Sequence, residues 1–169
     1  MEAATRERKS PQKHRDLALK LSALVVRCMG PRGNEVFRVI DESGLTFAQM
    51  KVLVELQVPD EESRTVTAIS EELGISVASA SRATDGLVRK KLATRVEDAN
   101  DRRVRRLTLT PKGRRLADRI ISARLATLED FTASLEPAER QKLESALNAL
   151  LERPEIAAIY SNHERKVSR

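Results

Sequence analysis

Residues 67–110 read TAISEELGISVASASRATDGLVRKKLATRVEDANDRRVRRLTLT, and this stretch decides the fold. Its first helix is expected to be capped by Thr67 and to run to Leu73. Gly74 then supplies a left-handed turn, and Ser76 caps a second helix. Two strands are predicted after that helix: Leu92–Glu97 and Val104–Thr110. The order of helix, glycine turn, helix and hairpin predicts a winged helix-turn-helix.

The second helix, expected to end near Lys91, divides into two faces. The core-facing set is expected to be Val77, Ala80, Thr84, Leu87 and Val88. The opposite face carries Ala78, Ser79, Arg82, Asp85, Gly86 and Arg89. Small residues and hydroxyls permit close approach to base edges, and arginine side chains reach guanine or phosphate. Gly86 costs the helix roughly 1 kcal/mol relative to alanine. We interpret it as a tolerated weak spot, and the alternative is that it lets the backbone approach DNA.

The hairpin is expected to carry a basic tip. Arginines at such a tip can enter a minor groove, where the potential is most negative. Asp98 and Asp101 can pair with some of these arginines and leave others free. Val104 is out of phase with the alternating pattern of the second strand, so we expect a bulge near the tip. The candidate DNA-contacting residues are Ser76, Val77, Ala78, Ser79, Ser81, Arg82, Arg89, Arg102, Arg103 and Arg105.

The segments on either side are predicted to be helices by their apolar spacing and punctuation. Gly30 to Gly33 break the N-terminal helical stretch, Thr110-Pro111 starts a long helix, and Pro137 opens the last one. Together these features predict a mainly α protein with a small β-hairpin wing and with dimerisation helices at both ends. The expected organisation is a flexible basic arm (1–13), N-terminal dimerisation helices (14–44), a winged helix-turn-helix lobe (45–110), C-terminal dimerisation helices (111–153) and a tail (154–169).

The composition and the charge distribution exclude several classes of function. The stretch 64–115 holds 13 Lys and Arg against 6 Asp and Glu, and the rest of the chain is close to neutral. A localised basic block is typical of a polyanion site. An aromatic content of 2% argues against a stacking platform for single strands. No apolar run is long enough for a membrane span, and no cluster suits a metal, a cofactor or an enzyme's catalytic group. We expect a cytoplasmic protein.

Five segments together resemble the MarR family of transcriptional regulators over about residues 15–152. They are LTFAQMKVL (45–53), AISEELGIS (68–76), SRATDGL (81–87), DRR (101–103) and LTLTPKG (107–113). The resemblance implies a homodimer whose winged lobes bind a palindromic operator in double-stranded DNA. It also implies release of the DNA by small phenolic or lipophilic ligands, or by oxidants. Lys91 departs from the glycine that is common there, and Asn100 departs from a frequent arginine.

Three hypotheses about the function stay open. The first is a regulator, expected to be a repressor, that a small aromatic or lipophilic effector releases from its operator. The second is a redox-sensing regulator that uses Cys28, a residue that is otherwise a buried structural thiol. The third is a winged-helix module that binds a protein or RNA partner without operator specificity. A large preference for one palindrome, beyond the salt dependence that all basic proteins show, separates the first from the third.

Overall fold

The computed structural model describes residues 11–29, 34–57, 65–97 and 105–167. The helices are α1 (Pro11–Met29), α2 (Asn34–Ser43), α3 (Phe47–Glu55), α4 (Val66–Glu72), α5 (Val77–Arg89), α6 (Pro111–Ala133), α7 (Pro137–Leu151) and α8 (Pro154–Val167), and the strands are β1 (Ala93–Glu97) and β2 (Arg105–Leu109). The predicted fold class, mainly α with a small hairpin wing, is confirmed. In the described part of the chain, no helix is long and apolar enough to cross a membrane.

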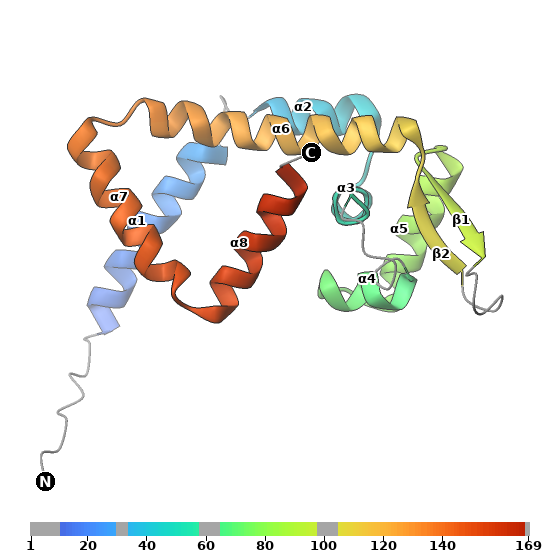
Figure 1. Ribbon diagram of the computed structural model, residues 1–169, viewed down its shortest axis with the longest axis horizontal. Coiled ribbons are helices and arrows are strands. Elements are labelled where there is room, and N and C mark those ends of the chain that lie inside the picture. The colour runs from blue at the N-terminus through green and yellow to red at the C-terminus, as the bar shows by residue number, and fades with distance from the viewer. Residues whose placement is uncertain (1–10, 30–33, 58–64, 98–104, 168–169) are drawn as a thin grey trace, which may run out of the picture.

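The long helix α6 connects the two ends of the molecule (Figure 1). At one end lie α3, α4, α5 and the hairpin, which together form the winged lobe. At the other end lie α1 and α7, and α2 runs alongside α6. Helix α8 turns back from α7, so its last turn lies near the middle of α6 (Figure 1).

The core of the winged lobe draws one or two apolar side chains from each element. Leu53 of α3, Ile69 of α4, Leu87 of α5 and Leu107 of β2 are all fully buried. Helix α6 closes this core with Ala117, which is also fully buried. Because burial of apolar surface is the main stabilising contribution to folding, α6 and the winged lobe form one packed unit.

Side-chain caps begin the helices of the lobe largely as predicted. Thr46 forms a capping box with Gln49, with its own amide donating to Gln49 Oε1 at 3.1 Å. Ser76 caps α5, and Thr110 caps α6 with a proline at the first helical position. The cap predicted for α4, Thr67, is wrong. Thr65 takes that place, because its Oγ1 accepts a hydrogen bond from the backbone of the third residue along, at 3.2 Å.

The hairpin is a regular antiparallel pair. Ala93 pairs with Leu109 and Glu97 with Arg105, without an extra residue in either strand. Leu107 and Leu109 turn into the core, and Thr108 between them is only half-buried, as the alternation predicts. The bulge expected at Val104 lies outside the described residues, as does the hairpin tip.

The two ends of the chain differ from the prediction. Helix α1 already begins at Pro11, within the segment expected to be an arm, and residues 1–10 are not described. The segment predicted as a tail forms the helix α8. Proline is well suited to the first helical position, so Pro154 starts this helix rather than only ending the one before it.

Candidate nucleic-acid interface

Helix α5 is the central element of the candidate interface. Its inner face is buried against α3 and α4 through Ala80, Ala83, Thr84 and Leu87. The hydroxyl of Thr84 donates to the carbonyl of Ser81 at 2.8 Å, so this buried polar group is satisfied. The prediction that Ala80, Thr84 and Leu87 face the core is therefore confirmed.

A chain of hydrogen bonds organises the first turns of the exposed face. Ser76 Oγ accepts from the Ser79 amide at 3.2 Å and donates to Ser79 Oγ at 2.9 Å. Arg82 Nη2 also donates to Ser79 Oγ, at 3.2 Å. Both lone pairs of that oxygen are thus occupied, which leaves the Ser79 hydroxyl hydrogen available as a donor. The arginine is thereby held along the helix, toward its N-terminus.

The predicted contact residues take different positions on this face. Ala78, Arg82 and Arg89 are exposed, and Ser79 and Ser81 are half-buried. Val77, expected on the core face as well as among the contacts, is 52% exposed. It occupies the first position of the helix, beyond the edge of the lobe's core, so its assignment to the core face is wrong.

Gly86 is buried beneath the side chain of Gln49 from α3, so its backbone is not open to DNA. A Cβ at this position would lie 2.0 Å from Gln49 Nε2. The capping box holds the Gln49 side chain in place through Thr46, so α3 lies directly over the Gly86 backbone. Gly86 is buried, and the exposed face of α5 therefore excludes it.

The wing is attached to α5 by an ion pair that the sequence did not reveal. Arg95 on β1 places Nη2 2.5 Å from Asp85 Oδ1 on α5. The negative charge of Asp85 is thus neutralised within the lobe, which favours the approach of a polyanion to this face of α5. Of the wing arginines proposed as contacts, Arg105 is exposed at the start of β2, and Arg102 and Arg103 lie outside the described residues.

The turn between α5 and β1 is tightly held. Lys91 has a φ of 58°, in the left-handed region that favours glycine. Thr110 Oγ1 donates to the carbonyl of Lys91 at 2.9 Å, and the Thr110 amide donates to the carbonyl of Leu92 at 3.0 Å. Glycine is common at this position in the family that the sequence resembles, and the positive φ of Lys91 explains why glycine suits it.

Other sites considered from the sequence are distant from this face. Cys28 is half-buried in the last turn of α1. Within the described residues, no group of His, Cys, Asp and Glu side chains could hold a metal ion.

A capped helix-turn-helix with a paired wing, presenting a polar and basic helix face, defines a winged helix-turn-helix protein. Residues 43–104 match the profile of the MarR family. The chain is thus similar to the MarR family over this segment, and it shares the fold of solved structures of MarR transcription regulators.

Solved structures agree in fold over most of the chain. RV1404 from Mycobacterium tuberculosis is 26% identical with a TM-score of 0.65, over 85% of this chain and 93% of that one. YusO from Bacillus subtilis is 24% identical with a TM-score of 0.64, over 85% and 97%. MepR, a regulator of the Staphylococcus aureus multidrug efflux pump MepA, is 20% identical with a TM-score of 0.63, over 82% and 96%. Among curated protein sequences, none matches the chain.

Proposed function

We propose that this protein is a homodimeric transcriptional repressor that binds a palindromic operator and is released from it by a small lipophilic or aromatic ligand. The observation that carries the proposal is the Ser76–Ser79–Arg82 chain on the exposed face of α5. It presents a hydroxyl donor and an oriented guanidinium at the end of the helix that enters a major groove in this class. MepR, one of the structural neighbours, has been solved with an oligodeoxyribonucleotide.

Unpartnered apolar surface on the outer helices supports the dimer. No residue of α7 is buried in the single chain, although Leu147 and Leu150 are apolar. Helix α1 leaves Leu17, Leu21 and Val25 more than half exposed. A symmetric partner would cover these exposed apolar side chains with the same helices.

A cavity between α6 and α8 supports the small ligand. Its volume is about 260 Å³, and it is lined by Ile121, Leu125, Leu128, Tyr160, Arg124, His163 and Glu164. Loss of hydration around the Arg124 guanidinium lowers its pKa, so a bound acidic group would restore favourable interactions to this cation. MepR has been solved with ethidium bromide. The ligand screen below therefore includes small aromatic ligands of positive as well as negative charge.

Selection of bound duplexes from a random library tests the proposed DNA binding. The full chain is expected to enrich one palindrome, and to bind it about 10³-fold or more tighter than random duplex at physiological salt. Replacement of both Arg102 and Arg103 is expected to weaken binding to all sequences and to flatten the salt dependence. Binding that depends on salt but enriches no sequence would instead favour the interaction module without operator specificity.

Light scattering tests the proposed dimer, and gel shifts test the proposed response to a ligand. A dimer is expected at micromolar concentration, and a monomer would contradict the proposed assembly. A screen of phenolic and lipophilic ligands is expected to find one that weakens operator binding roughly 5–150-fold without dissociating the dimer. A Cys28→Ser variant treated with peroxide is the parallel arm. If oxidation acts only through Cys28 and no ligand acts, the redox hypothesis replaces this one.

A further inference from the structure

Helix α8 closes a frame between the two ends of the molecule. The winged lobe packs on the first half of α6, where Ala117 and Ile120 enter its core. Helix α7 follows the other end of α6, and α8 returns from α7 toward the lobe (Figure 1). The lobe and the far end are therefore connected through α6 and, a second time, through α7 and α8.

The C-terminal half of α8 meets the lobe through two polar contacts with acidic residues. Lys166 Nζ donates to Glu55 Oε2, at the end of α3, at 2.8 Å. Asn162 Nδ2 donates to Glu72 Oε1, at the end of α4, at 3.2 Å. Lys166 is only 8% exposed, and a lysine buried to this degree needs a partner for its charge. Because hydrogen bonds are directional, the two contacts define one position of α8 against the lobe.

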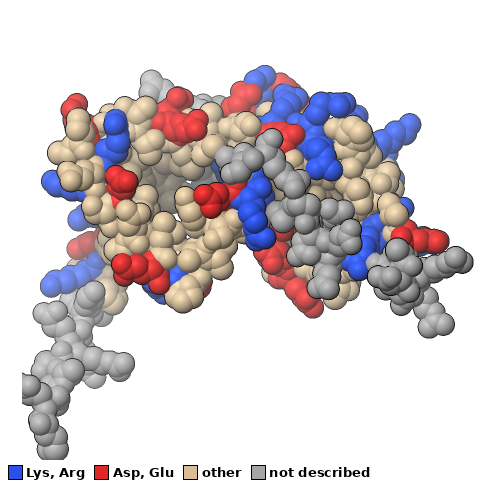
Figure 2. Space-filling view, viewed as in Figure 1, with Lys and Arg blue, Asp and Glu red and all other residues tan. Residues whose placement is uncertain are grey.

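Apolar packing contributes little to this position of α8. Ile159 and Tyr160 are more than half exposed, and within residues 154–166 only Lys166 is buried. A cavity of about 260 Å³ lies between α8 and α6. The same face of the molecule is hollowed between α7 and α8 (Figure 2). The attachment of α8 to the lobe therefore depends on its two polar contacts rather than on a shared apolar core.

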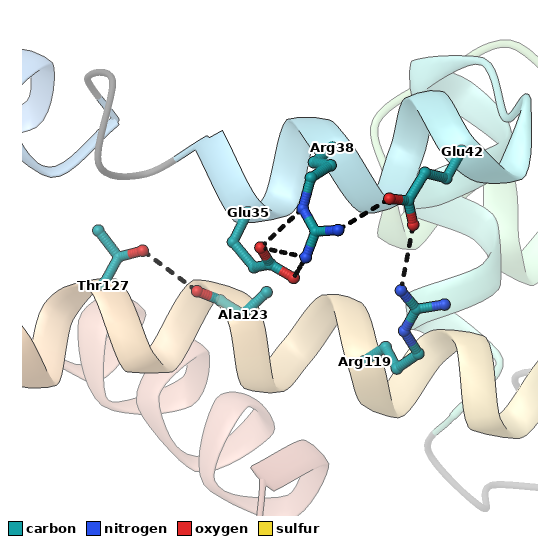
Figure 3. Close-up of polar contacts among 6 residues, drawn as sticks. All are labelled: Glu35, Arg38, Glu42, Arg119, Ala123 and Thr127. Carbon is teal, nitrogen blue, oxygen red and sulfur yellow. Dashed lines mark hydrogen bonds and ion pairs between the residues drawn. The ribbon is translucent and has the colours of Figure 1, made fainter.

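The direct connection through α6 has a weak point. Thr127 Oγ1 donates to the carbonyl of Ala123 at 3.2 Å, one turn earlier in the same helix (Figure 3). Threonine bonds of this kind slightly destabilise a helix and often bend it. The bond lies between Ile120, in the core of the lobe, and the end of α6 at Ala133. A bend there tilts the lobe relative to α7, and the second connection through α8 limits that tilt.

Helix α2 belongs to the lobe's side of this weak point. Val39 of α2 is buried in the core of the lobe. Glu42 of α2 accepts a hydrogen bond from Arg119 of α6 at 3.3 Å, and Arg119 precedes Thr127 by two turns (Figure 3). Helix α2 is thus fixed to the first half of α6 and moves with the lobe, so it does not replace the connection through α8.

We propose that α8 is a strap that positions the winged lobe for binding DNA, with Asn162 and Lys166 as its positioning residues. The DNA part of this inference rests on the proposed function. The two lobes of a dimer must enter successive major grooves about 34 Å apart. A lobe that is held at the right angle before binding loses less freedom when it binds. Release of α8 therefore weakens operator binding while the lobe itself stays folded.

The variant Glu55→Gln/Asn162→Ala/Lys166→Met, which we call the strap variant, tests the proposal. It removes one positive and one negative charge, so the net charge that attracts DNA at long range is unchanged. We expect it to bind the selected palindrome about three- to tenfold more weakly in fluorescence anisotropy. Arg153→Gln/Glu155→Gln is the matched control, because it removes an exposed ion pair at the other end of α8. The control is expected to bind as the wild-type chain does.

A distance measurement without DNA tests the strap independently of any operator. Spin labels on Thr94→Cys in the wing and Ser145→Cys in α7, both exposed positions, report how widely the lobe moves relative to α7. The labelled chain also carries Cys28→Ser and is diluted with unlabelled chain. The strap variant is expected to broaden the distance distribution, and the control is expected to leave it unchanged. Thermal melts establish that the variants fold. If the strap variant is unfolded, Glu55→Gln/Lys166→Met takes its place in both measurements.

Two results of the distance measurement would overturn the proposal: a distribution as narrow as that of the wild-type chain, and equal broadening in the control. Tighter operator binding by the strap variant would overturn it as well, because α8 would then hold the lobe in a position that DNA disfavours. Broadening in a chain that selects no palindrome would support the strap and contradict the proposed function. A selected palindrome that the strap variant binds as tightly as the wild-type chain would contradict the positioning role alone.

Discussion

Arg95 on β1 donates a hydrogen bond to Asp85 on α5, so one ion pair fixes the wing against the helix that presents the candidate contacts. Both side chains are about one-third exposed, at 34% and 38%. Ion pairs with this exposure contribute only about 0.2–1 kcal/mol to stability. The pair therefore matters more for the geometry of the interface than for the free energy of folding.

A double-mutant cycle with Asp85→Asn and Arg95→Gln measures that geometric role. We expect a coupling energy of about 1 kcal/mol in operator binding, because either single variant releases the wing, and no more than that in unfolding. Arg105→Gln, at an exposed position of β2, is the control for loss of a wing charge. A coupling energy of zero in operator binding would show that the pair does not position the wing.

Gly113 is expected to be irreplaceable for a steric reason. A Cβ there would lie 1.9 Å from the carbonyl oxygen of Leu92, which is backbone and cannot move aside. Gly113→Ala is expected to cost about 3 kcal/mol or more in the free energy of unfolding, measured by urea titration. Gly74→Ala is the comparison. Gly74 has a φ of 60°, and a Cβ added there would meet nothing within 4 Å, so only backbone strain of about 1 kcal/mol is expected.

Lys91 offers a stabilising substitution. Its φ of 58° costs a non-glycine residue about 1–2 kcal/mol, and glycine removes that cost while adding unfolded-state entropy of about 0.4–1 kcal/mol. Lys91→Gly is thus expected to raise the free energy of unfolding by about 0.5–1 kcal/mol. Lys91→Ala keeps the strain and should give no gain. A gain as large from alanine would mean that the lysine charge, not the backbone, is responsible.

Helix α8 is attached to the winged lobe by a nearly buried ion pair. Lys166 Nζ lies 2.8 Å from Glu55 Oε2, and the two side chains are only 8% and 12% exposed. Lys166→Met leaves the carboxylate without its partner, so we expect a loss of about 3 kcal/mol in chemical denaturation. Adding Glu55→Gln should restore most of it, and the exposed Arg165→Met should have little effect. If Lys166→Met left the free energy of unfolding unchanged, α8 would not dock through this ion pair.

Local sequence rules predicted much of the fold. The caps at Ser76 and Thr110, and the alternation in β2, depend only on neighbouring residues, and they are as predicted. Helix α8 was predicted as a tail, although Pro154 is a local start signal. Its ion pair between Lys166 and Glu55 joins residues that are far apart in the sequence, and local rules do not predict such a contact.

In the candidate site, too, local sequence rules predicted some features and contacts between distant residues determined others. The exposure of Ala78 and Arg82 followed from helical periodicity. The packing of Gly86 did not follow from periodicity, because it depends on Gln49 of another helix. The pairing of Arg95 with Asp85, between the wing and α5, did not follow from it either.

The most direct test of the central claim compares Arg82→Ala with the wild-type chain by fluorescence anisotropy, on the selected palindrome and on a scrambled duplex. We expect the variant to lose about 1–3 kcal/mol of affinity for the palindrome and little for the scrambled duplex, because a base contact carries sequence preference. Arg165→Ala, which removes the same charge from α8, should leave both affinities nearly unchanged. Equal losses on the two duplexes, or a wild-type chain without preference for either, would contradict the account.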